Sequence, residues 1–137
     1  VVPGMRTRKF GRIVNITSAM VKTPRLAMGL STAARAGLTA FSKALSAEVI
    51  RDNVTINNLL PERIETDRLR YMTDKLAKHK GISLAQAREE MLCPIPAGRF
   101  GRPEELAAAC IFLCSQQAGY ITGQNLQLDG GAYSGLI

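Results

Sequence analysis

Apolar residues recur along the chain at two different spacings, and the change from one to the other predicts strands that alternate with helices. Three short segments are predicted as strands: residues 12–17, which are rich in β-branched residues, and residues 54–60 and 125–129. Longer segments are predicted as helices: residues 31–51, 67–80, 83–91 and one that begins at 103. Residues 1–9 are predicted to be the end of another helix. This order is typical of an α/β fold with a parallel sheet.

The longest predicted helix, residues 31–51, carries two apolar faces. One is a stripe at three- and four-residue spacing, a pattern typical of a face packed on the core: Ala34, Leu38, Phe41, Leu45 and Val49. The other holds only small residues: Ala33, Ala36, Gly37 and Ala40. Small residues permit close helix approach, inside the fold or across a subunit interface. Ser31 is expected to cap the start of this helix.

The first predicted strand ends on two hydroxyl residues. Its apolar residues Ile13, Val14 and Ile16 are expected to be buried. Ser18 follows directly, at the carboxyl end of the strand, where open α/β sheets place their ligand crevices. The helix predicted at residues 83–91 begins with a capping box, with Ser83 three residues before Gln86.

Composition narrows the class of protein. At 137 residues with 46% hydrophobic content, the chain is long enough for one globular domain, and it has no apolar run of membrane-spanning length. The net charge is +7, which raises nucleic-acid binding as an alternative. Only 5% of the residues are aromatic, so a solvated surface is the favoured interpretation of the clustered charges. No nucleic-acid or membrane partner is expected.

The three cysteines do not form a disulfide framework, and a reducing cytoplasm is therefore expected. Cys110 and Cys114 lie four residues apart on one predicted helix, so a metal pair is an alternative. His79 is the only histidine and no other cysteine has ligand spacing. Small buried residues are therefore the favoured interpretation, and no metal site is expected.

Three segments together resemble the short-chain dehydrogenase/reductase family. They are the strand, loop and helix of residues 11–41, the segment PERIETDRL at 61–69, and the ending TGQNLQLDGG at 122–131. The resemblance covers nearly the whole chain but only the C-terminal half of a family member. It implies the C-terminal portion of a doubly wound Rossmann-like fold, with residues 1–137 as part of a single domain and 65–95 as a substrate lid. The N-terminal dinucleotide-binding half, with its Gly-rich turn, is expected to be absent.

The same resemblance implies a site and shows where the chain departs from the family. Ser18, Ser31 and Arg35 occupy the catalytic positions, but the family carries Tyr and Lys where this chain has Ser31 and Arg35. An aliphatic hydroxyl is far less acidic than a phenol, whose pKa of about 10 a nearby cation can lower to a useful range. The implied cofactor-binding residues are Arg35, Pro61, Ile64 and Thr66.

The second departure is Glu62, which stands where the family has Gly. Gly tolerates backbone angles that Glu enters only at a cost, so local strain is expected here. A carboxylate at this position would lie near the nicotinamide. It would either favour the oxidised, cationic ring or indicate that the pocket no longer holds a nicotinamide.

The resemblance therefore implies a divergent NAD(P)-dependent oxidoreductase, similar to 3-oxoacyl reductases, acting on a carbonyl or alcohol substrate. Two alternatives remain: a catalytically inactive cofactor-binding or regulatory paralogue, and a structural subunit of an oligomer. NAD and NADP are not distinguished, and the 137-residue chain by itself is not expected to be active. A homo-oligomer, dimer or tetramer, is expected through the helix at 31–51. The strand at 12–17 is expected to lie at a sheet edge without its neighbour, an arrangement that favours aggregation.

Overall fold

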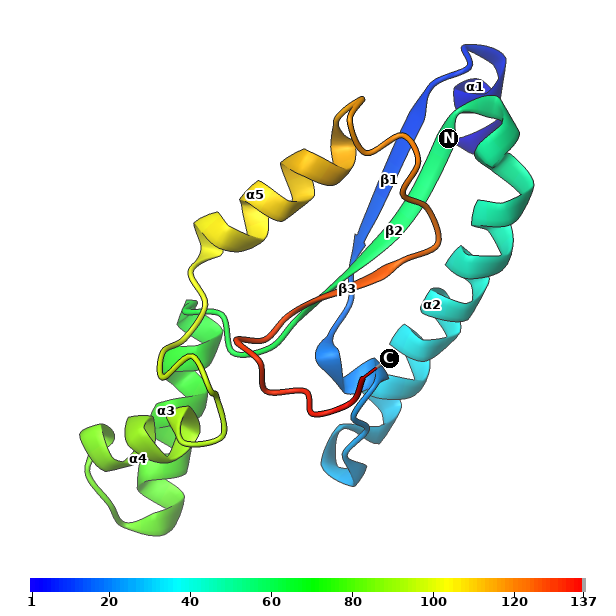
Figure 1. Cartoon of the computed structure of the whole chain (residues 1–137). Coiled ribbons are helices and arrows are strands. Elements are labelled where there is room, and N and C mark those ends of the chain that lie inside the picture. Colours follow the sequence, from blue (N-terminus) through cyan, green and yellow to red (C-terminus); the bar gives the residue numbers. More distant parts are fainter. Residues whose placement is uncertain (137) are drawn as a thin grey trace.

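The computed structural model describes residues 1–136 and shows strands alternating with helices (Figure 1). The main elements in chain order are α1 (Val2–Thr7), β1 (Gly11–Ile16), α2 (Gly29–Val49), β2 (Val54–Pro61), α3 (Asp67–Lys80), α4 (Leu84–Leu92), α5 (Pro103–Cys114) and β3 (Asn125–Leu128). Short 3-10 turns lie at Ala19–Val21, Leu26–Met28 and Ile50–Asp52. The predicted strands and helices are confirmed, with α3 at the predicted bounds.

The three strands form one parallel sheet in the order β1-β2-β3. Helix α2 covers one face and α5 covers the other, the arrangement of a doubly wound fold (Figure 1). In the register, Gly11 lies beside Val54, and Asn58 lies beside Asn125. Within residues 1–136 no strand pairs with the outer edge of β1. The α/β fold class and the edge position of β1 are thus confirmed.

The core is built on β2, which is buried from Val54 to Leu60. On the α2 side, Val54 and Ile56 pack against Val49. On the α5 side, Leu59 packs against Leu113. Each such aliphatic side chain contributes about 1.5–3 kcal/mol when fully buried, so helices on both faces of the sheet account for the burial of the aliphatic residues of β2.

Three polar residues interrupt the aliphatic residues of β2: Thr55, Asn57 and Asn58. Asn57 is hydrogen-bonded to the loop before β3 and Asn58 across the sheet, whereas the Thr55 hydroxyl has no hydrogen-bond partner in residues 1–136. The Asn58 amide donates to the Asn125 side-chain oxygen at 2.8 Å and accepts from the Asn15 amide at 3.0 Å. The same Asn15 nitrogen also donates to the Ser42 hydroxyl of α2 at 3.0 Å. This chain of hydrogen bonds ties all three strands and α2 to one register.

The face that α2 turns to the sheet was predicted correctly only at its C-terminal end, where Val49 is buried and Leu45 packs beside it. Its buried residues are Thr32, Thr39, Ser42, Ser46 and Val49. In the predicted stripe, Leu38 is 41% exposed and Phe41 is 64% exposed. Short polar side chains let the helix approach the sheet closely, and hydroxyls such as those of Thr39 and Ser46 bond to carbonyls within the helix.

Burial of Ile16 was also predicted wrongly, since it is 53% exposed. Ile13 and Val14 are half-buried. Ile16 lies at the carboxyl end of the edge strand β1. Within residues 1–136 no strand lies beside the outer edge of β1, and Ile16 remains exposed.

Helices α3 and α4 form a hairpin that projects beyond the carboxyl end of the sheet (Figure 1). The capping box at Ser83 and Gln86 is confirmed. Leu69, Ile95 and Phe100 pack together beneath the hairpin. None of the helices in residues 1–136 has the length and apolar character that crossing a bilayer requires.

Candidate active site

A cleft of about 830 Å³ opens at the carboxyl ends of β1 and β2, between the start of α2 and helix α3. All six residues predicted for catalysis or cofactor binding line it: Ser18, Ser31, Arg35, Pro61, Ile64 and Thr66. They come from three segments far apart in sequence. The fold brings these segments together because parallel strands deliver their carboxyl ends to the same edge.

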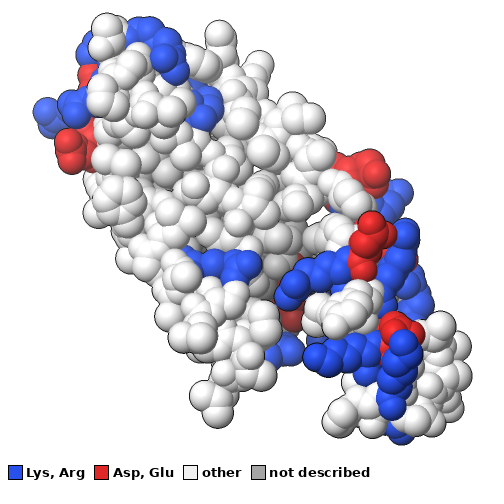
Figure 2. Space-filling model, turned by 180° about the vertical axis from the view of Figure 1, so that it is seen from behind, with Lys and Arg blue, Asp and Glu red and all other residues white. Residues whose placement is uncertain are grey.

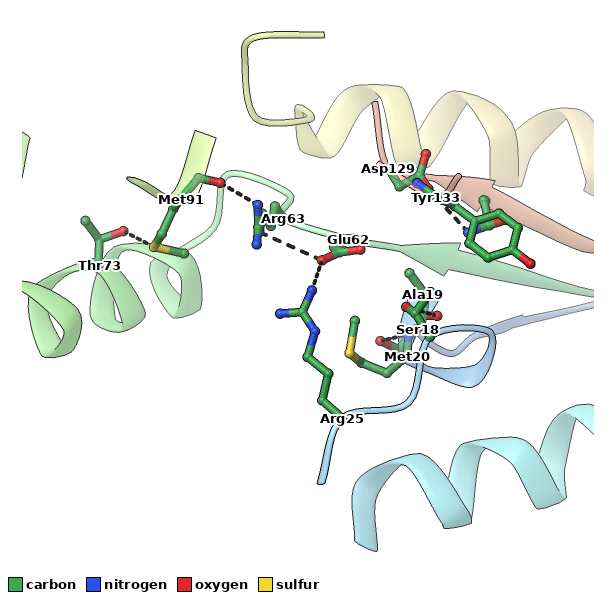
Figure 3. A network of polar contacts seen from close by, with 12 residues as sticks. Ser18, Ala19, Met20, Arg25, Glu62, Arg63, Thr73, Met91, Asp129 and Tyr133 are labelled. Carbon is green, nitrogen blue, oxygen red and sulfur yellow. Dashed lines mark hydrogen bonds and ion pairs between the residues drawn. The ribbon is translucent and has the colours of Figure 1, made fainter. Parts of the chain in front are cut away.

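Ser18 is held by the turn that follows β1. Its backbone is extended, and its Oγ accepts a hydrogen bond from the Met20 backbone N–H at 3.2 Å (Figure 3). Thr17, just before it, is buried and bonds to the Leu59 carbonyl through both its backbone N–H and its hydroxyl. The Ser18 hydroxyl hydrogen is left available to donate to an oxygen in the cleft.

Ser31 and Arg35 form a contact pair on the first turns of α2. The helix begins at Gly29 after Met28, so Ser31 lies inside the helix and is not its cap. Its Oγ instead contacts Nη1 of Arg35, which also donates to the Ser31 carbonyl at 3.2 Å. The prediction of a cap was wrong because the preceding 3-10 turn leads directly into the helix.

The segment after β2 is fixed on both sides by backbone hydrogen bonds. The Glu62 N–H donates to the Leu128 carbonyl at 3.0 Å, and the Glu65 N–H donates to the Gly101 carbonyl at 2.7 Å. Between them, the Ile64 N–H donates no hydrogen bond within residues 1–136. It is a free backbone donor at the position that the resemblance assigns to cofactor binding.

Strain was expected at Glu62 but falls on the next residue. Arg63 has a φ of 53°, in the left-handed region, whereas Glu62 does not. Such a conformation costs about 1–2 kcal/mol for a residue with a Cβ. Arg63 is held there by a hydrogen bond from its Nη1 to the Met91 carbonyl at 2.5 Å.

The Glu62 carboxylate joins two arginines across the cleft (Figure 3). Its Oε1 lies 3.5 Å from Nη2 of Arg25, on the loop after β1, and 3.8 Å from Nε of Arg63. Through Arg63 and Met91 this network connects the loop after Ser18 to the α3–α4 hairpin. The sequence analysis identified Glu62 as a departure but not its two partners.

Further residues, none of them assigned to the site from the sequence, line the opposite wall. Helix α3 presents Arg68, Tyr71 and Lys75 to the cleft. Tyr71 and Lys75 are four residues apart and thus repeat the Tyr-x-x-x-Lys spacing on a different helix. That spacing was a readable signal in the sequence. Lys and Arg side chains gather at this end of the molecule, around the hollow beside the hairpin (Figure 2).

The donor set of the cleft fits a nicotinamide nucleotide. Arg35 supplies a permanent cation with several N–H donors suited to ribose hydroxyls, and the free Ile64 N–H suits a carboxamide oxygen. The Thr32 hydroxyl is buried in the same wall and has no hydrogen-bond partner in residues 1–136. The Thr55 hydroxyl, in the core and outside the cleft lining, also has no partner in residues 1–136, so this feature of Thr32 does not by itself indicate a ligand.

Cys110 and Cys114 have no third metal-ligating side chain beside them within residues 1–136. Among residues 1–136 no group of three or more His, Cys, Asp or Glu side chains could hold a metal ion. Cys110 is half-buried, but Cys114 is exposed, contrary to the prediction that both are buried. Cys114 lies one helical turn after Cys110 on the same side of α5, and burial and the neighbouring Cys110 raise the pKa of its thiol.

The family model described as Enoyl-(Acyl carrier protein) reductase matches residues 1–133. The chain belongs to the short-chain dehydrogenase/reductase family. It is 38% identical over 128 residues to the NADPH-dependent reductase BacG of Bacillus subtilis, covering 93% of this chain and 49% of that protein. It is 36% identical over 133 residues to the 3-oxoacyl-[acyl-carrier-protein] reductase FabG of Vibrio cholerae, covering 97% and 50%.

Solved structures agree with this assignment. The NADPH-dependent reductase YwfH, involved in bacilysin biosynthesis, superposes with a TM-score of 0.89 at 36% identity, over 96% of this chain and 50% of that one. An F189W actinorhodin polyketide ketoreductase with NADPH gives 0.88 at 30% identity, over 96% and 51%. The chain thus spans about half the length of the relatives it matches, and its parallel sheet corresponds to part of their Rossmann-like fold.

Proposed function

We propose that the full-length protein carrying this chain is an NAD(P)-dependent oxidoreductase that acts on a carbonyl or alcohol substrate, as 3-oxoacyl reductases do. The observation that carries the proposal is the convergence of Ser18, the Ser31–Arg35 pair and the segment around Ile64 on one cleft. The named reductases among its relatives support the same reaction class. Its three free cysteines suit a reducing cytoplasm.

The cleft residues have different roles in substrate orientation and cofactor binding. Ser18 donates its free hydroxyl hydrogen to the substrate oxygen and so orients the reacting carbon. Arg35 binds ribose hydroxyls, while Pro61, the Ile64 N–H and Thr66 hold the carboxamide end. A bound nicotinamide supplies or accepts the hydride. The permanent charge of Arg35 stabilises the negative charge that develops on the substrate oxygen.

Proton delivery to the substrate oxygen is the step in which this protein departs from its family. A serine hydroxyl cannot replace a phenol as a general acid, because its acidity is too low for one cation to correct. We propose that Ser31, held by Arg35, positions a water that delivers the proton. Tyr71 and His79 also line the cleft and can donate a proton; Tyr71 is the phenol, on the opposite wall, with Lys75 four residues later.

The proposal also assigns roles to the α3–α4 hairpin, as a lid, and to the exposed face of α2, as a subunit contact. Residues 65–95 form a lid whose inner surface includes Leu69, Met72 and Leu76. The exposed Leu38 and Phe41 support a homo-oligomeric contact through α2.

In a second candidate function, the protein binds the cofactor without catalysis or serves as a structural subunit. Ser31 favours these alternatives because it stands where the family resemblance implies the catalytic Tyr. Hydride transfer by the full-length protein separates these functions. We expect oxidation of NADH or NADPH, followed by absorbance, with at least one carbonyl compound from a panel of ketones and 3-oxo thioesters. Tight cofactor binding without turnover would contradict the oxidoreductase and support the paralogue.

Two single variants test the roles proposed for cofactor binding and for proton delivery. Arg35→Ala should weaken cofactor binding about tenfold or more, because it removes a charged donor. Tyr71→Phe should leave kcat within about threefold if Ser31 and water deliver the proton. A loss near the 10²–10⁴-fold typical of a missing general acid would assign the proton to Tyr71 instead.

A further inference from the structure

The lysines and arginines of α3 differ in their pairing according to the side of the helix on which they lie. Three of the five are ion-paired and lie outside the cleft lining: Arg70 with Asp67, Lys78 with Asp74, and Lys80 with Glu90, at 2.9, 2.7 and 2.5 Å. The other two, Arg68 and Lys75, have no acidic partner within residues 1–136, and both line the cleft. The helix therefore neutralises its cations everywhere except where they face the site.

The wall opposite α3 does not supply the missing negative charge. Glu62 is the only carboxylate among the residues that line the cleft, and it is already bonded to Arg25 and Arg63. Arg35 adds one more positive charge to the lining. The cleft thus carries an excess of positive charge, and Lys and Arg side chains gather around its mouth (Figure 2). An excess of one sign within a cleft raises the local concentration of ligands of the opposite sign.

The position of the two free cations indicates which part of a ligand they would meet. Arg68 and Lys75 are seven residues apart, two helical turns on the same side, and Met72 and Leu76 line the cleft with them. The rise of an α-helix separates their backbones by about 10 Å, a gap that two long, flexible side chains can close. A ligand that suits this wall has an apolar body and an anionic group.

We infer that Arg68 and Lys75 form an anion-binding subsite of the substrate cleft, so that the preferred carbonyl or alcohol substrate carries a carboxylate or phosphate group. This inference rests on the proposed function, since it names the substrate class of the same site. Hydrogen bonds from cations to carboxylate or phosphate are about twice as strong as neutral ones, and they strengthen further when the cleft excludes water.

The test compares ligands that differ only in charge, using the full-length protein. Ketones of equal chain length ending in a carboxylate, a phosphate monoester or a methyl ester are titrated by calorimetry with cofactor present, and their KM values are measured. We expect at least one anionic ketone to bind about tenfold or more tightly than the ester. The carboxylate and phosphate arms show which anion is preferred. The preference should shrink between about 0.05 and about 0.5 M salt, because exposed charges are screened.

Matched variants assign the preference to residues. Arg68→Ala and Lys75→Ala should each reduce the ratio of anion to ester affinity by about tenfold and leave ester binding unchanged. Arg70→Ala and Lys78→Ala remove the same charges from the same helix outside the cleft, and should leave the ratio unchanged.

The outcomes separate this inference from the proposed reaction. Equal binding of ester and anion, with turnover of both, would overturn the subsite and leave the oxidoreductase standing. An anion preference that depends on Arg68 and Lys75, without turnover, would support the subsite and contradict the reaction. Loss of NAD(P) affinity in both variants with an unchanged anion-to-ester ratio would assign the cations to the phosphates of the cofactor and overturn the inference.

Discussion

Arg25 reaches across the cleft to Glu62, with 3.5 Å between Nη2 of the guanidinium and Oε1 of the carboxylate. The family has Gly where this chain has Glu62, so the ion pair is a feature of the departure itself. The carboxylate also lies 3.8 Å from Nε of Arg63, whose side chain is only 17% exposed, whereas that of Arg25 is 58% exposed. The two arginines therefore depend on Glu62 to different degrees.

We expect Glu62→Gln to lower the free energy of unfolding by about 1–2 kcal/mol, because it leaves the half-buried Arg63 without a counter-charge. Arg25→Ala should have a smaller effect, below about 1 kcal/mol, since an exposed ion pair contributes little. Thermal melts of the full-length variants measure both. Equal destabilisation by the two substitutions would show that the buried pair with Arg63 is not the important one.

Restoring the phenol and amine of the family should raise turnover. In the double variant Ser31→Tyr/Arg35→Lys, a tyrosine would again stand four residues before a lysine on α2, facing the cleft. We expect kcat for ketone reduction to increase at least tenfold, because a positioned general acid contributes about 10²–10⁴-fold. The control is Ser31→Phe/Arg35→Lys, which has the same ring without the hydroxyl. Equal rates for the two double variants would mean that the phenol is not used.

The exposed apolar face of α2 should mediate self-association. Phe41→Asp places a charge on a side chain that is 64% exposed, next to Leu38 on the same helix. We expect this substitution to dissociate the oligomer, because a buried unpaired charge at an interface is strongly unfavourable. Sedimentation equilibrium measures the change in mass. Leu84→Asp, on the hairpin and 58% exposed, is the matched control and should leave the assembly intact. An unchanged mass for Phe41→Asp would place the subunit contact elsewhere.

Glu105 should contribute to stability only above acidic pH. The Arg99 side chain and the Arg102 backbone N–H hydrogen-bond to its carboxylate and lower its pKa from 4.5 to about 2. Because the folded pKa is depressed, the stabilisation is complete above about pH 4.5 and is lost as the pH falls toward about 2.

Glu105→Gln should therefore destabilise the protein at neutral pH and flatten the fall in its melting temperature within that acidic window. Melts of the full-length protein between these pH values measure the difference. Glu104→Gln, one residue earlier in the same helical turn, is the control and should leave the slope unchanged. Parallel curves for Glu105→Gln and the unsubstituted protein would contradict the assignment.

Elements with local signals were predictable from the sequence. Residues 54–60, between the turn at Asp52-Asn53 and Pro61, were predicted as a strand, and the structure buries β2 from Val54 to Leu60. Helix α3 occurs at its predicted bounds, and the Ser83–Gln86 capping box marks the start of α4. The convergence of Ser18, Ser31 and Arg35 with the segment after β2 was implied by the family resemblance, and the structure brings them to one cleft.

Only the tertiary structure decided which neighbour each side chain meets. Helical spacing groups Leu38 with Phe41, but it does not say whether the sheet or the outside covers them, and here the sheet takes the polar face of α2 instead. The sequence places Arg68 and Arg70 two residues apart without distinguishing them. The fold turns Arg68 to the cleft and leaves Arg70 beside Asp67. Periodicity and composition act within a segment, whereas burial and charge pairing depend on segments that meet only when the chain has folded.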